Sequence, residues 1–300
     1  MKTKLITIVG QTATGKSALG IALAQKFNSE IISADSRQIY KGFDLCSGKV
    51  TKAEQRQVPH HMIDIVNIGE AFSAYDFQLQ AYNIIDNSPL ATHFLVGGTG
   101  LYVAAVAAGY DMKPSHSDNE KATNLRNELD AHSVAQLQNM LTPTAKEQLQ
   151  KNNSDYNNKR RLIRIIEKTI AGEPITKQAN PKYNVLQLGC YWQKDKLHKR
   201  IDQRLKERID QGMIEEVETY LKNGANPLYL ENLGLEYRYT MHYLTGVIAT
   251  KDEYVEVLSR SIKNFAKRQG TWFRKDDSIK WLDMEDSGIV DKAFKLVLGF

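Results

Sequence analysis

The sequence has few cysteines and no long apolar segment, and these absences exclude several classes of protein. Its two cysteines, Cys46 and Cys190, lie far apart, without the spacing of a disulfide framework or a zinc site. The longest apolar candidate, residues 101–110, is shorter than the roughly 18 residues that span a bilayer. The adjacent His60 and His61 would point to opposite faces of a strand. We therefore expect neither a metal cluster nor a membrane partner.

The N-terminal residues lack the features of an export signal. An apolar stretch follows the first lysines, but it continues into a glycine-containing loop with no cleavage site between them. The chain has 300 residues, of which 42% are hydrophobic, which suits one large domain or two. No internal repeat or low-complexity tract is present. These features predict a globular, cytoplasmic protein, which we expect to be a monomer.

A phosphate-binding motif lies near the start of the chain. An apolar run at 5–9 predicts a buried parallel strand, residues 10–17 match G-x-x-x-x-G-K-[ST], and residues 18–27 predict a helix. Loop N–H groups and the helix N-terminus would attract a phosphate, Lys16 would add a cation, and Ser17 could ligate Mg²⁺. The predicted loop residues are Gly10, Gln11, Thr12, Ala13, Thr14, Gly15, Lys16 and Ser17. Whether the phosphate is transferred, hydrolysed or expelled stays open.

Two further predicted strands end in polar residues. Residues 30–34 lead into Asp35, and because ligands bind beyond the carboxyl ends of parallel strands, Asp35 should face the same crevice as Lys16. It could equally ligate Mg²⁺ or cap a helix. The strand at 94–97 ends in a glycine turn without an acid, which weakens an ATP-hydrolase interpretation. Thr99 either reaches the crevice or belongs to a turn needed only for helix–sheet packing.

The remaining patterns predict an α/β fold with a polar, helical insertion. The fold class is a P-loop NTPase-like parallel sheet core flanked by helices. Further strands are expected at 60–66, 183–191 and 278–284, and further helices at 72–85, capped by Ser73, and 289–298. The predicted domains are a catalytic core, 1–112 with 182–300, and an insertion, 113–181.

The net charge of +5 is unevenly distributed. Residues 151–210 contain 15 Lys or Arg against 7 Asp or Glu, whereas residues 259–275 contain 6 against none. Within the first segment, Arg160, Arg164 and Lys168 are spaced to share one helix face. Such segments favour a polyanion larger than a nucleotide, although ordinary solvated helix faces are the alternative.

Two other basic sets allow more than one interpretation. Arg200, Arg204 and Arg208 repeat every four residues beside an apolar stripe, so one could reach the phosphate loop while the others pair with surface acids. Around Trp272, cations alternate with an aromatic residue. This mixture fits contact with unstacked bases, although Trp272 could instead close the core.

Taken together, the motifs resemble those of the bacterial tRNA dimethylallyltransferases, also called tRNA isopentenyltransferases. The resemblance covers nearly the whole chain. It depends on the phosphate loop, D-S-x-Q-x-Y at 35–40, V-G-G-T-G-L-Y at 96–102, R-L-I-R at 161–164 and K-R-Q-x-x-W-x-R at 267–274. It implies transfer of a dimethylallyl group from dimethylallyl diphosphate to N6 of adenosine 37, in tRNAs that read codons beginning with U. The loop would then hold a departing diphosphate, with Mg²⁺ at Ser17, and ATP would not be the substrate.

The resemblance also implies residue roles. Asp35 would be the base that accepts the N6 proton, a role that agrees with a place in the crevice rather than with a Mg²⁺ ligand or a helix cap. The implied catalytic residues are Asp35, Thr12, Lys16 and Arg204, with Arg200 as the alternative to Arg204. The implied tRNA contacts are Asp35, Ser36, Arg37, Gln38, Thr99, Arg160, Arg161, Arg164, Lys267, Arg268, Gln269, Trp272 and Arg274.

Two departures from the family pattern and two rival functions qualify this interpretation. Residues 45–50 read L-C-S-G-K-V instead of I-G-T-A-K-P, with Lys49 expected to keep the cation, and Glu236 replaces a glycine beside the expected RNA path. The rivals are an adenylate isopentenyltransferase or P-loop small-molecule kinase, and a non-catalytic RNA-binding protein. The two basic segments disfavour an enzyme that acts on small molecules alone. The intact Lys16 and Asp35 disfavour a non-catalytic RNA-binding protein.

Overall fold

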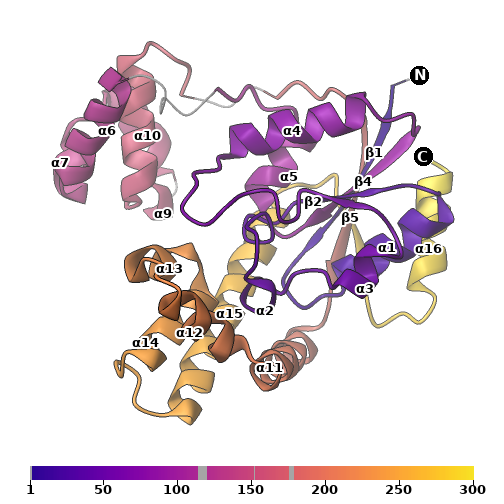
Figure 1. Ribbon diagram of the computed structural model, residues 1–300. Coiled ribbons are helices and arrows are strands. Elements are labelled where there is room, and N and C mark those ends of the chain that lie inside the picture. Colours follow the sequence, from indigo (N-terminus) through magenta and orange to yellow (C-terminus); the bar gives the residue numbers. More distant parts are fainter. Residues whose placement is uncertain (1, 114–119, 152, 176–178) are drawn as a thin grey trace. The chain divides into compact units, whose positions relative to one another are not determined.

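The computed structural model describes residues 2–113, 120–151, 153–175 and 179–300, and these residues form an α/β fold (Figure 1). The chain divides into two compact units, one ending at Gly109 and resuming with Pro181–Phe300, the other comprising Tyr110–Asn180. This division lies within a few residues of the insertion predicted at 113–181. Within the described ranges, no helix is both long and apolar enough to cross a membrane.

The first unit holds all the named strands and most of the helices. Its strands are β1 (Lys4–Gly10), β2 (Ile31–Ser33), β3 (His60–His61), β4 (Thr92–Gly97), β5 (Asn184–Tyr191) and β6 (Lys280–Asp283). Its helices are α1 (Lys16–Lys26), α2 (Asp44–Ser47), α3 (Lys52–Gln55), α4 (Ala74–Asp86), α5 (Gly100–Ala107), α11 (Lys194–Asp210), α12 (Met213–Lys222), α13 (Pro227–Leu233), α14 (Leu235–Leu244), α15 (Lys251–Phe273) and α16 (Ile289–Leu298).

The strands form one parallel sheet in the order β3-β2-β4-β1-β5-β6. Residues from α1 and α16 pack with Ile6 and Ile8 of β1, whereas residues from α4 and α5 pack with Leu5 and Val9. Figure 1 shows the two pairs of helices on either side of the sheet. Successive strand residues therefore enter different cores, and β1 is buried on both faces. The predicted parallel sheet flanked by helices is confirmed. Because the strands are parallel, their carboxyl ends lie at the same edge of the sheet.

The third predicted strand is shorter than expected. Residues 60–66 were predicted as a strand, but β3 ends at His61. Met62 and Asp64 have φ angles of 63° and 57°, a left-handed conformation that an extended ladder cannot contain. The chain turns at these residues, and the Asp64 and Ile65 N–H groups then donate to the carbonyls of residues 38 and 39 before Val66 forms a bridge with Tyr40.

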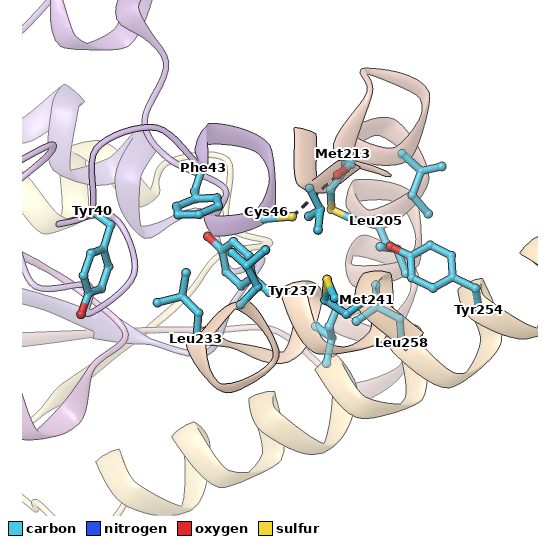
Figure 2. Packing of buried hydrophobic residues seen from close by; sticks show 14 of the residues in the cluster. Tyr40, Phe43, Cys46, Leu205, Met213, Leu233, Tyr237, Met241, Tyr254 and Leu258 are labelled. Carbon is cyan, nitrogen blue, oxygen red and sulfur yellow. Dashed lines mark hydrogen bonds between the residues drawn. The ribbon is translucent and has the colours of Figure 1, made fainter. Parts of the chain in front are cut away.

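A third core lies beside the sheet, among α11 to α15. The apolar stripe predicted for α11 is buried in it, as shown for Leu205 in Figure 2. Phe43, which precedes α2, enters the same core and packs edge-on against Tyr237, with ring centroids 5.0 Å apart. Full burial of a phenylalanine contributes roughly 1.5–3 kcal/mol. The segment that follows Asp35 is therefore held against α11 to α15 by this shared core.

The unit Tyr110–Asn180 is helical in its described part. Its helices are α6 (Glu120–Ala131), α7 (Val134–Asn139), α8 (Pro143–Gln150), α9 (Asn153–Tyr156) and α10 (Lys159–Ile170). Leu162, Ile163 and Ile166 of α10 are buried in a small core with Leu129 and Leu137. Ile165 is half-buried and packs against the same core.

Candidate active site

The phosphate loop joins β1 to α1 at the sheet edge. Gly10 has a φ of 142°, and a Cβ added there would lie 2.4 Å from the Cys190 carbonyl oxygen, so only glycine fits. The Lys16 ammonium donates a hydrogen bond to the Gln11 carbonyl oxygen at 2.6 Å. Burial lowers the pKa of Lys16 to about 8. The loop thus has the strand–loop–helix geometry that its motif predicts, with a desolvated ammonium inside it.

Asp35 lies just beyond β2 and acts electrostatically on the phosphate loop. Its charge raises the pKa of Lys16, opposing the larger effect of burial, and it also acts on Arg204. Its Oδ1 accepts a hydrogen bond from the Arg37 N–H at 2.8 Å, within a turn. Among the described residues this is the carboxylate's one hydrogen bond, and no helix begins there. The helix-cap interpretation is therefore wrong.

The loops after β2 and β4 are joined directly. The Ser36 N–H donates to the Thr99 hydroxyl at 3.0 Å, and the Thr99 N–H donates to the Ala34 carbonyl. The buried Gln38 amide donates to the Gly48 carbonyl at 3.2 Å. Ser36 and Thr99, predicted separately, thus belong to one polar cluster at the carboxyl ends of neighbouring strands.

Two arginines of α11 reach the phosphate loop, where one was expected. Arg204 donates to the Thr12 hydroxyl at 3.5 Å and to the Gly48 carbonyl at 3.1 Å. Arg200 donates to the Ala13 carbonyl at 2.9 Å. The ring of Trp192, which the sequence analysis missed, stacks under the Arg200 guanidinium at 4.4 Å and donates its N–H to the loop. Its signal was its position directly after β5, at the same sheet edge.

The third arginine, Arg208, is buried rather than paired at the surface. It donates to the carbonyls of Leu45 and Cys46 and to the Glu236 carboxylate at 3.3 Å. Glu216 accepts the N–H groups of the same two residues, at 2.8 and 2.9 Å. Both departures from the family pattern therefore meet at α2, and Glu236 offsets a buried cation.

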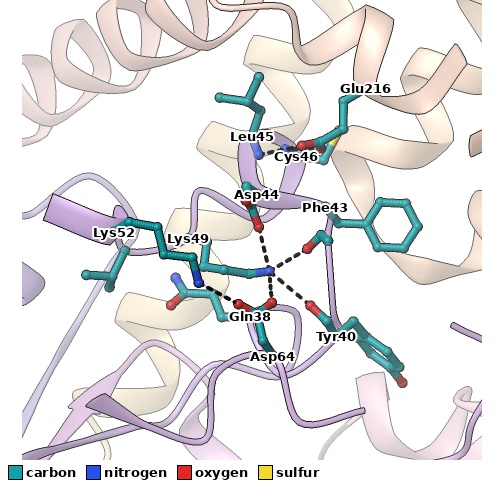
Figure 3. Close-up of polar contacts among 12 residues, drawn as sticks. Gln38, Tyr40, Phe43, Asp44, Leu45, Cys46, Lys49, Lys52, Asp64 and Glu216 are labelled. Carbon is teal, nitrogen blue, oxygen red and sulfur yellow. Dashed lines mark hydrogen bonds and ion pairs between the residues drawn. The ribbon is translucent and has the colours of Figure 1, made fainter. Parts of the chain in front are cut away.

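Lys49 does not provide a cation for the diphosphate, contrary to expectation. Figure 3 shows its ammonium enclosed by Asp44, Asp64 and backbone carbonyls, including that of Tyr40. The two carboxylate contacts measure 2.7 and 2.5 Å, and the Lys49 side chain is 2% exposed. Its charge is neutralised inside the segment that connects Gln38 to α3.

The end of α15 separates the predicted RNA contacts into two groups. Lys267, Arg268 and Arg274 are exposed, and no ion pair involves them in the described chain. Trp272 is 37% exposed, so it does not close the core. Gln269, in contrast, is buried and bonded to both loops of the site.

The predicted tRNA contacts on α10, which are Arg160, Arg161 and Arg164, are partly neutralised within their own unit. Arg161 pairs with Asp155 at 2.5 Å, and Arg164 pairs with the buried Glu167 at 3.4 Å. Arg160 is exposed and forms no ion pair with the described residues. A phosphate bound by these residues would therefore compete with existing carboxylates at two of the three arginines.

The protein matches family models and known proteins over most of its length. Residues 38–276 match the IPP transferase family, and residues 3–71 match the isopentenyl transferase family. The chain is 43% identical to tRNA dimethylallyltransferase 2 of Shewanella sediminis, over 93% of this chain and 92% of that protein. It is 39% identical to the tRNA dimethylallyltransferase of Treponema pallidum, with 95% and 92% covered.

Solved structures agree with this assignment. The tRNA isopentenylpyrophosphate transferase of Bacillus halodurans is 32% identical and superimposes with a TM-score of 0.73, covering 99% of this chain and 96% of that one. A eukaryotic dimethylallyltransferase acting on tRNA is 25% identical, with a TM-score of 0.74 and coverages of 99% and 79%. The match spans both units and every loop of the site. The chain therefore belongs to the IPP transferase family, and the two relatives named above are tRNA dimethylallyltransferases.

Proposed function

We propose that the protein transfers a dimethylallyl group from dimethylallyl diphosphate to N6 of adenosine 37 in tRNAs that read codons beginning with U. The observation that carries this proposal is that Asp35 follows β2 at the same sheet edge at which the phosphate loop follows β1, in a chain of this family. The products are N6-(dimethylallyl)adenosine and diphosphate. Family membership favours tRNA over free adenine nucleotide as the acceptor.

The reaction requires a base because the N6 lone pair is delocalised into the purine. N6 attacks the allylic carbon, the bond from that carbon to the diphosphate oxygen breaks, and the electron pair leaves with the diphosphate. The Asp35 carboxylate takes the N6 proton. Its turn with Arg37 uses Oδ1 and fixes the carboxylate near Ser36 and Thr99. A base extruded from the anticodon loop would meet this cluster.

The departing diphosphate gathers negative charge, and the loop is built to receive it. Lys16 provides an ammonium, the α1 N-terminus provides N–H groups, and Arg204 provides a guanidinium beside Thr12. A Mg²⁺ ion could be coordinated by the Ser17 hydroxyl together with the substrate's own phosphate oxygens. No cluster of three His, Cys, Asp or Glu exists in the described ranges, so an all-protein cage is not built. When bound, the ion would neutralise diphosphate charge.

The exposed cations provide the surface for the tRNA backbone. Lys267, Arg268 and Arg274 extend from the helix that contacts the phosphate loop, with Trp272 available to stack on an unpaired base. Arg160, Arg161 and Arg164 are the proposed contacts from the helical insertion. We place the reaction in the cytoplasm, with the protein acting as a monomer.

The proposal is tested by incubating purified protein with dimethylallyl diphosphate, Mg²⁺ and a pool of unmodified tRNAs. We expect mass spectrometry of the digested RNA to find N6-(dimethylallyl)adenosine at position 37. A tRNA with guanosine at position 37 is the matched control and should remain unmodified. Absence of the prenylated nucleoside from every tRNA that reads UNN codons would refute the proposal.

A further inference from the structure

The last two turns of α15 contact both loops of the site. The Gln11 side chain donates to the Ala266 carbonyl at 3.0 Å. The space over Gly100 is filled by Trp272, because a Cβ added to that glycine would lie 2.2 Å from the indole Nε1. The helix is therefore packed against the phosphate loop on one side and the loop after β4 on the other.

Gln269 lies between these two loops. Its Oε1 accepts the Thr12 N–H at 2.8 Å, and its Nε2 donates to the Gly98 carbonyl at 3.0 Å. The residue is 8% exposed. Both amide heavy atoms are thus bonded to backbone inside the protein, which is the pattern of a structural clamp. A Cβ added at Gly98 would lie 2.5 Å from this Nε2, so that glycine leaves the room that the clamp needs.

Thr12 links this clamp to the diphosphate site. Its N–H is held by Gln269, while its hydroxyl accepts from Arg204, which in turn holds the Gly48 carbonyl. Without Gln269, the Thr12 N–H would lose its partner, and the first half of the loop would be held less firmly, by the side-chain contacts of Gln11 and Arg204. A buried donor without a partner costs about 1–3 kcal/mol, so the loop would rearrange.

We infer that Gln269 is a positioning residue for the diphosphate, not a contact for tRNA. The inference rests on the proposed function and changes the role that the sequence motif implies for this residue. Lys267 and Arg268, its exposed neighbours on α15, remain the contacts for RNA. Adjacent residues of one motif would thus serve the two substrates separately.

The test measures the two substrates separately. Gln269→Met keeps the side-chain length and removes both hydrogen bonds, and Gly98→Ala displaces the Gln269 amide without altering it. For both variants we expect the dissociation constant of inorganic diphosphate with Mg²⁺, measured by calorimetry, to rise about tenfold, as the loss of a hydrogen bond predicts. The dissociation constant of tRNA should change less than twofold. In prenyl transfer, KM for the donor should rise and KM for tRNA should not.

Arg268→Met is the matched control and should weaken tRNA binding while leaving diphosphate binding intact. The inference is overturned if both Gln269→Met and Gly98→Ala bind diphosphate as the wild type does, or if they lose tRNA affinity instead. Binding stoichiometry reports the folded fraction of each sample, so partial unfolding is not mistaken for weak binding. A wild-type protein that binds diphosphate but prenylates no tRNA would refute the proposed function and leave the clamp itself intact.

Discussion

The basic rows of α11 and α15 look alike in sequence, but the structure uses them differently. Arg204 and Arg208 of α11 turn inward and donate to backbone carbonyls around the site. Arg268 and Arg274 at the end of α15 are exposed. Spacing alone shows which residues share a helix face, not whether that face meets protein or solvent. Inward charges should therefore affect turnover and stability, and outward charges should affect RNA affinity.

Among the variants that test this contrast, the largest effect on turnover is expected at Asp35, whose charge faces inward. Asp35→Ala should lower turnover by on the order of 10²-fold or more, because the N6 proton loses its acceptor. tRNA affinity should persist, since the outward cations are unchanged. Single-turnover prenyl transfer and a filter-binding assay measure the two quantities. Wild-type turnover in the variant would remove Asp35 from the base role.

Arg208 tests whether an inward charge holds the fold. Arg208→Met should lower the free energy of unfolding by about 3 kcal/mol, because the Leu45 and Cys46 carbonyls and Glu236 lose a buried partner. Urea denaturation followed by circular dichroism measures it. The control is Arg260→Met, whose exposed pair with Glu256 should contribute no more than about 0.5 kcal/mol. Equal losses in the two variants would contradict the distinction.

A pH titration probes Lys16, whose pKa burial lowers to about 8. In the free protein, Lys16 loses its proton as pH rises through this value, whereas bound diphosphate would keep Lys16 protonated. Binding above pH 8 then takes up a proton, so diphosphate affinity should fall by up to about tenfold per pH unit. In Lys16→Arg the guanidinium stays charged, so calorimetric titrations of this variant should no longer show the fall in diphosphate affinity above pH 8. If the affinity of the variant fell equally above pH 8, the pH dependence would belong to another group.

The smallest expected effect comes from a single outward cation. Arg268→Ala should weaken tRNA binding severalfold and lower the slope of log affinity against log salt by roughly 0.7–0.9, which is the contribution of one phosphate contact. Diphosphate affinity should not change. Arg260→Ala, which removes a cation already paired with Glu256, should alter the slope less. An unchanged slope for Arg268→Ala would mean that this cation is an ordinary solvated group.

The sequence by itself determined the parallel sheet, the phosphate loop and the family. These features follow from local patterns: an apolar run before a glycine loop, and motifs in a fixed order. The short β3 could not be predicted in the same way, because Met62 and Asp64 adopt the left-handed conformation without a glycine, which is its usual signal in a sequence.

Only the tertiary structure decided what the charged and polar side chains do. Lys49 is enclosed by carboxylates, Arg208 by carbonyls, and Gln269 by two backbone loops, although each has the sequence signature of a surface or substrate contact. The physical reason is that a polar side chain takes whichever partners the fold brings within about 3 Å. Those partners lie more than a hundred residues away for Arg208 and Gln269, beyond any pattern of local spacing.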